Sequence, residues 1–122
     1  MVLFLFSCGS PKKRKKVPST NRKEADYVQL WVEQNGGQIE VRLNDRSRVD
    51  ILTSKYAIEA DFAHKWAEAI GQSLYYSTKT GKKAGVLLIM RKGSDKRSLI
   101  RFKTIVKEQG LPITLFILED YQ

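Results

Sequence analysis

The chain has 122 residues, of which 42% are hydrophobic and 29% are charged, and its formal net charge is +9. That length fits one domain, and the composition is typical of a soluble globular protein, which excludes fibrous and wholly disordered classes. The single cysteine, Cys8, excludes an internal disulfide, and the single histidine, His64, excludes mechanisms that need two imidazoles.

Residues 1–22 are predicted to form a flexible basic tail. Residues 1–23 hold seven of the Lys and Arg residues and no acid, so the remaining chain has fifteen bases against thirteen acids. Net charge alone is therefore weak evidence that the folded part binds nucleic acid. The opening run MVLFLFSC resembles the end of a lipoprotein signal, which would place a lipidated Cys8 at a periplasmic membrane. The run is short and lacks a basic leader, so a frayed apolar end of a cytoplasmic protein is an equal alternative.

The folded domain is expected over residues 23–122. Apolar residues recur at helical spacing over 23–34, and Asn35, Gly36 and Gly37 end that helix. Three short β-rich runs follow at 38–43, 48–53 and 56–61, separated by turn residues. These runs predict an antiparallel meander.

The second half of the chain alternates helices and buried strands. A stripe of Ala63, Trp66, Ala67, Ile70 and Leu74 predicts a helix over 62–77 that lies on the sheet, with Asp61 as its cap. The apolar run 85–90 predicts a central strand covered on both faces, and the run 113–118 predicts a second, fully apolar strand. A basic amphipathic helix is expected between them over 94–109. The order is αβββαβαβ, which indicates an α/β domain with a mixed sheet. No segment approaches the ~20 apolar residues of a membrane span.

Two acidic residues fall on neighbouring predicted strands. Asp50 stands early in the second strand, and Glu59 stands near the end of the third. Apolar residues flank each acid, so strict alternation would turn both acids onto one face of the sheet. Ordinary solvent-facing acids on an antiparallel sheet would share a face in the same way.

Over residues 23–90, the order of elements and the places of these two acids resemble the core of the PD-(D/E)XK nucleases. The resemblance implies a restriction-endonuclease-like fold in which Asp50, Glu59 and the backbone carbonyl of Ala60 bind Mg²⁺ or Mn²⁺. Mg²⁺ suits such a site because it takes one or two carboxylates and keeps its other positions for water and phosphate. The metal would lower the pKa of a bound water and neutralise charge on the scissile phosphate.

The chain departs from the family at its lysine, because Asp61 stands two residues after Glu59. Some branches place the lysine on the following helix, where this chain has Lys65. Gln72 and Tyr76 resemble the QxxxY element of the RecB-like branch, and at about 100° per residue they share a helix face with Lys65. The resemblance implies that Lys65 assists the attacking water and that Gln72 and Tyr76 position the substrate. Alternatively, this face is simply solvated.

Glu24, early in the first helix, matches an acid that many members of the family add to the metal site. It also suits a helix N-terminus, where a negative charge is favourable whatever the function. Both interpretations stay open.

The sequence therefore predicts a divalent-metal-dependent nuclease, alone or as a homodimer, whose expected substrate is DNA, with RNA as the alternative. Two alternatives stay open: an inactive nucleic-acid-binding module of the same fold, and a lipid-anchored envelope protein. Phosphate contacts are expected from two groups of basic residues, because such contacts position DNA without reading its sequence. These residues are Arg42, Arg46, Arg48, Lys79, Lys82 and Lys83.

Overall fold

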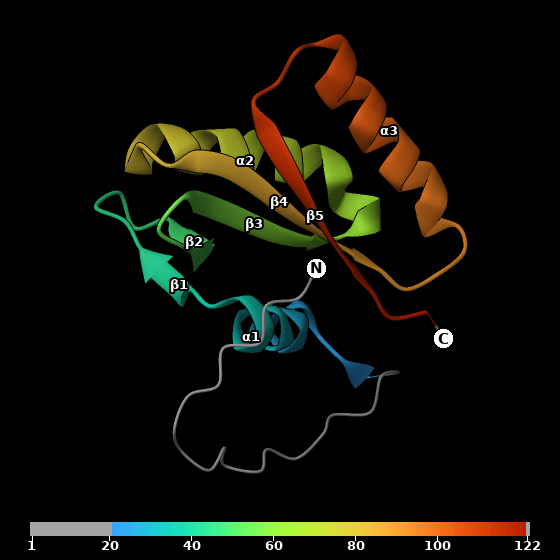
Figure 1. Cartoon of the computed structure of the whole chain (residues 1–122), viewed down its shortest axis with the longest axis horizontal. Helices are drawn as coiled ribbons and strands as arrows, with labels where there is room; N and C mark the ends of the chain where they lie inside the picture. The colour runs from blue at the N-terminus through green and yellow to red at the C-terminus, as the bar shows by residue number, and fades with distance from the viewer. Residues whose placement is uncertain (1–20, 122) are drawn as a thin grey trace.

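A computed structural model describes residues 21–121. Five strands form one mixed sheet in the order β1-β2-β3-β4-β5 (Figure 1). The first three pair antiparallel, and β3, β4 and β5 pair parallel. Their bounds are β1 Gln38–Arg42, β2 Arg48–Leu52, β3 Tyr56–Phe62, β4 Lys83–Met90 and β5 Ile113–Glu119.

Helices cover both faces of this sheet. Helix α1 (Glu24–Asn35) lies on one face, and α2 (Trp66–Thr80) and α3 (Asp95–Glu108) lie on the other (Figure 1). A short 3₁₀ turn, η2 (Ala63–Lys65), connects β3 to α2. The predicted order αβββαβαβ and the mixed α/β class are confirmed.

The core has a layer on each side of β4. Leu87 packs toward α1 together with Ile58, whereas Val86 and Leu88 pack toward α2 and α3. Every residue of β4 after Lys83 is buried. The prediction that this apolar run is a strand covered on both faces is therefore correct.

Part of the predicted stripe meets the sheet, because Ala63 is buried and Trp66 and Ile70 pack against the core. Ala67 is exposed, whereas Ala69, Ser73 and Tyr76 are buried against the sheet. The small side chains of Ala69 and Ser73 let the helix approach β3 closely. The cap prediction is also wrong, because Asp61 lies inside β3 and makes no cap hydrogen bond to the helix.

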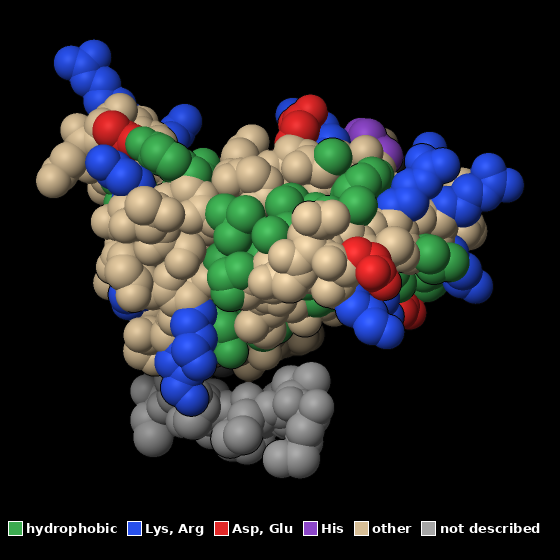
Figure 2. Space-filling model, turned by 90° about the horizontal axis from the view of Figure 1, so that it is seen from above, with side chains coloured by type: hydrophobic (Ala, Val, Ile, Leu, Met, Phe, Trp, Pro, Cys, Tyr) green, Lys and Arg blue, Asp and Glu red, His purple; other side chains and the backbone are tan. Residues whose placement is uncertain are grey.

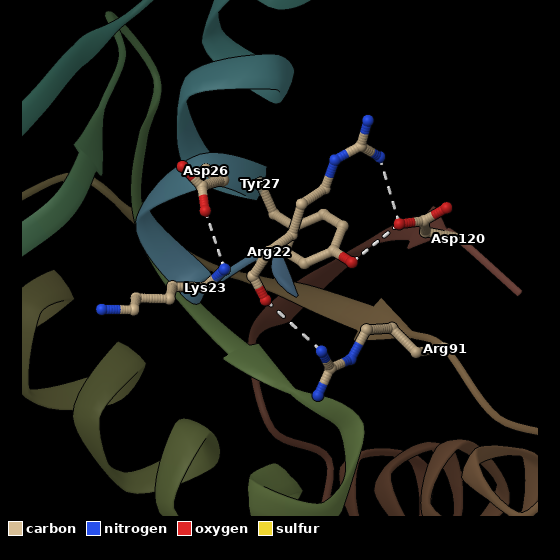
Figure 3. Close-up of polar contacts among 6 residues, drawn as sticks. All are labelled: Arg22, Lys23, Asp26, Tyr27, Arg91 and Asp120. Atoms are coloured by element: carbon tan, nitrogen blue, oxygen red, sulfur yellow. Dashed lines mark hydrogen bonds and ion pairs between the residues drawn. The ribbon is translucent and has the colours of Figure 1, made fainter. Parts of the chain in front are cut away.

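A polar network fixes the start of α1 (Figure 3). The Asp120 carboxylate accepts hydrogen bonds from Arg22 Nη1 at 3.1 Å and from the Tyr27 hydroxyl at 2.7 Å. Arg91 Nη1 donates to the Arg22 carbonyl at 3.4 Å, and its guanidinium lies 3.9 Å above the centre of the Phe62 ring. These contacts tie the first turn of α1 to the carboxyl ends of β3, β4 and β5.

Within residues 21–121, no helix is long and apolar enough to cross a membrane. Cys8 and the other residues of the predicted tail up to residue 20 lie outside the described residues, so the lipid-anchor interpretation stays a prediction. Arg22, which was assigned to the tail, forms an ion pair with Asp120.

Candidate active site

Asp50 and Glu59 meet where the ladder between β2 and β3 ends. The two strands pair at Ile51 with Ile58 and at Leu52 with Ala57, and one further step of that register sets Asp50 opposite Glu59. At this step the Asp50 carboxylate accepts a hydrogen bond from the Ala60 backbone N–H at 2.8 Å. The acids singled out in the sequence therefore lie side by side.

The Glu59 carboxyl group is buried beside that of Asp50, with only 6% of the residue exposed. Burial, followed by the charge of Asp50 and a hydrogen bond between the two groups, raises the pKa of Glu59 to about 10. Burial also raises the pKa of Asp50, against the opposing effect of the Ala60 N–H. Two carboxylates this close cannot both ionise at low cost, so the pair retains a proton near pH 7.

Gln72 and Tyr76 bring α2 to this pair. With its amide oriented by its neighbours, Gln72 donates to the two Glu59 carboxylate oxygens at 2.8 and 3.3 Å. Tyr76 is 8% exposed, and burial, followed by the charge of Glu59, raises the pKa of its hydroxyl to about 12. The face of Gln72 and Tyr76 is therefore solvated only in part, because Tyr76 is buried whereas Gln72 is exposed and reaches Glu59 through its amide.

Lys65 lies among acids from two other elements. Its Nζ is 3.2 Å from Glu24 Oε1 and 4.0 Å from Asp61 Oδ1. The hydrogen bond to Glu24 is the main cause that raises the pKa of Lys65. Burial, followed by the charge of Glu24, raises the pKa of Asp61 to about 7. Glu24 is also the first residue of α1, so its negative charge lies at a helix N-terminus and both interpretations of it stay open.

A cavity of ≈320 Å³ opens between α1 and the first two strands, and Glu24, Glu40, Asp50 and Ala60 are among its lining residues. A larger hollow of ≈530 Å³ lies between the end of α1 and the β2–β3 turn, and its lining includes no carboxylate. The smaller cavity is therefore the one through which a ligand would reach Asp50.

Glu40 is a neighbour of the site that the sequence analysis missed. Ile39 pairs with Ile51 and Val41 with Val49, so Glu40 faces Asp50 across β1 and β2. Its backbone is left-handed, with φ of 52°, and its charge contributes to the raised pKa of Asp50. The register of the predicted hairpin was the signal that could have identified it.

The irregular backbone at Glu40 accompanies a break in the predicted alternation of side chains between the two faces of the sheet around Asp50. Val49 packs with Ala57 and Tyr76 on the α2 side, whereas Ile51 packs with Val28 on the α1 side. Strict alternation would have put both flanking residues on one face. Asp50 can therefore line the α1-side cavity and still contact Glu59.

No group of three or more His, Cys, Asp or Glu side chains within residues 21–121 is arranged as a metal site. The Asp50 and Glu59 pair nevertheless has the chemistry that Mg²⁺ prefers, because the ion commonly takes only one or two protein carboxylates. A divalent cation would replace the proton that the pair holds. The residues present therefore fit such an ion.

The predicted phosphate contacts form two groups. Arg42, Arg46 and Arg48 are exposed around the β1–β2 turn, next to the strand segments that carry Glu40 and Asp50. The three lysines at 79, 82 and 83 lie where α2 ends and β4 begins.

The lysine group lies at the amino end of β3. Lys83 pairs with Tyr56, the first residue of β3, and Glu59 lies three residues further on, or about 10 Å along the strand. Lys82 donates its Nζ to the Thr53 carbonyl. Among the arginines, Arg48 lies in β2 two residues before Asp50.

The chain matches no protein-family model, no curated protein and no solved structure.

Proposed function

We propose that this protein is a divalent-metal-dependent nuclease that hydrolyses phosphodiester bonds in DNA. The observation that carries the proposal is the contact between two carboxyl groups on adjacent strands: Asp50 lines an open cavity, and Glu59 is buried beside it with a raised pKa. Buried acids with strongly raised pKa values cluster at functional sites, because selection for fold stability alone disfavours them. The PD-(D/E)XK-like order of elements supports the same function.

Asp50 and Glu59 would hold Mg²⁺ or Mn²⁺, with the Ala60 carbonyl and Glu24 as further oxygen donors beside them. The ion would supply positive charge at the scissile phosphate and a lowered pKa for the attacking water. Each carboxylate must be deprotonated to bind it, so cation binding would release the proton that the pair holds.

Gln72 and Tyr76 would act on Glu59 rather than directly on the substrate. The Gln72 amide fixes the Glu59 carboxylate through its two hydrogen bonds, and Tyr76 is buried beside the same group. We therefore assign both as positioning residues. This assignment differs from the substrate contact that the QxxxY resemblance implies.

Lys65 would supply the positive charge that the family places two residues after the second acid. Its ammonium lies near Asp61, the residue that stands at that position in this chain, and is also held by Glu24. A lysine side chain of which 42% is exposed can turn from these partners toward a phosphate that enters the cavity.

A second candidate function is a DNA-binding module without catalysis. The ion pair of Lys65 with Glu24 favours it, because a lysine neutralised by an acid is less able to assist a water. This module would bind DNA without a divalent metal and would keep binding after Asp50→Asn.

The test is cleavage of supercoiled plasmid and circular single-stranded DNA by the full chain in Mg²⁺, Mn²⁺ or EDTA. Asp50→Asn and Glu59→Gln should each abolish metal-dependent cutting. Lys65→Gln should lower it by about 10²–10⁴-fold, the usual contribution of a proton-transfer group. Glu119→Gln, at an exposed acid of β5, and Lys55→Gln, at an exposed lysine, are matched controls that should cut like wild type.

If the purified wild type leaves both substrates intact in every metal, the nuclease proposal is wrong. Metal-independent binding that survives Asp50→Asn would then support the second candidate.

A further inference from the structure

The solvent face of α3 carries a row of cations that the sequence analysis did not single out. Lys96, Lys103 and Lys107 recur at helical spacing, are all exposed, and are called the α3 lysine stripe here. Arg97 and Arg101 are exposed beside them. None of the ion pairs recorded within residues 21–121 engages these five side chains.

The acids of α3 leave this face largely unneutralised. The Asp95 carboxylate accepts hydrogen bonds from the backbone N–H groups of Arg91 at 2.8 Å and Lys92 at 3.0 Å, so it is turned toward the preceding loop. Glu108, at the last position of the helix, is its other acid. Lys and Arg side chains gather at the end of the molecule that α3 occupies (Figure 2).

The chemistry of this face fits a polyanion rather than a lipid surface. A helix that lies in a membrane interface inserts an apolar face, but Leu99, Phe102 and Val106 of α3 already pack against the sheet. The exposed large apolar residues of α3 are Ile100, with 63% exposed, and Ile105, with 38% exposed, and exposed Lys and Arg side chains outnumber them. Closely spaced phosphates are the partner whose charge complements such a stripe.

The stripe also has the right place and length. Helix α3 begins just after the carboxyl end of β4 and contacts η2, the turn that carries Lys65. From Lys96 to Lys107 the helix advances about 16 Å, and each strand of a DNA duplex offers one phosphate per about 3.4 Å of axis. About five phosphates of one strand therefore lie within reach of the stripe.

We propose that the α3 lysine stripe binds the phosphate backbone of duplex DNA. The choice of DNA as the polyanion rests on the proposed nuclease function. The binding itself requires no metal and no chemistry at the carboxylates.

The test measures the salt dependence of binding by fluorescence anisotropy, with a labelled duplex and the full chain in EDTA, between about 50 and about 200 mM KCl. The triple variant Lys96→Gln, Lys103→Gln and Lys107→Gln keeps helix propensity and removes three positive charges. The control replaces Lys23 and Lys55 with Gln, because both side chains are exposed and neither is among the predicted phosphate contacts. Circular dichroism verifies that both variants are folded.

The slope of log K against log[KCl] should be smaller in magnitude by about 2.7 in the stripe variant than in the wild type, or about 0.9 for each lost phosphate contact. The control variant should keep the wild-type slope. An unchanged slope in the stripe variant, or an equal change in both variants, overturns the proposal.

Two further outcomes separate this proposal from the nuclease. Stripe-dependent binding by a protein that never cleaves DNA supports the stripe proposal and refutes the nuclease proposal. Metal-dependent cleavage, together with DNA binding that the stripe variant does not weaken, supports the nuclease proposal and refutes the stripe proposal. Binding of the wild type to vesicles of anionic phospholipid, with no binding to DNA, overturns the stripe proposal in favour of a membrane partner.

Discussion

Glu59→Gln should flatten the dependence of folding stability on pH. In the folded wild type, burial and the charge of Asp50 raise the pKa of Glu59 to about 10, whereas its ordinary value is 4.5. Between these two values the folded chain retains a proton that the unfolded chain has released. The unfolding free energy of the wild type must therefore fall as pH rises through that window.

One proton of difference corresponds to about 1.4 kcal/mol per pH unit. From about pH 6 to about pH 8, the wild type should lose about 3 kcal/mol relative to the variant, because a glutamine amide cannot ionise. Urea denaturation in EDTA at several pH values measures this difference through the midpoint and the m-value. Glu108→Gln, at an exposed acid of α3, should keep the wild-type slope.

The reasoning is refuted if Glu59→Gln and wild type lose stability in parallel over this range. The same titration in saturating MgCl₂ extends the test, because a bound cation replaces the shared proton. Mg²⁺ should then stabilise the wild type more at the higher pH and should have little effect on Glu59→Gln.

Three other substitutions test the packing that holds the site, each by urea denaturation. Gly85→Ala should cost about 1–3 kcal/mol, because the new Cβ would lie 2.9 Å from a side-chain carbon of Ile58; a neutral result would mean that β3 and β4 pack less tightly than described. Gly71→Ala should instead stabilise the protein by about 0.5–1 kcal/mol, because the helix surface there is open. Tyr27→Phe should cost about 1.5–3 kcal/mol, because it removes the hydroxyl that donates to Asp120; an unchanged midpoint would show that this network does not stabilise α1.

Much of the candidate site could be predicted from local sequence. Short turns join β1 to β2 and β2 to β3, so an antiparallel meander sets Asp50 beside Glu59 with little choice of register. The register of the predicted β1–β2 hairpin likewise sets Glu40 opposite Asp50. The left-handed backbone of Glu40 and the break in alternation at Asp50 could not be predicted, because both arise where β1, β2 and β3 are fitted together.

The sequence by itself determined the order and type of the elements, because apolar periodicity and turn residues act over a few neighbouring positions. Only the tertiary structure decided which side of α2 meets the sheet. The predicted stripe included only apolar residues. In the structure, the small side chains of Ala69 and Ser73 let α2 approach the sheet closely, and Gln72 provides the amide that the buried Glu59 carboxyl requires. The contact of Lys65 with Glu24 likewise joins residues 41 positions apart. Such contacts depend on how the helices pack across the sheet, which no local pattern in the chain specifies.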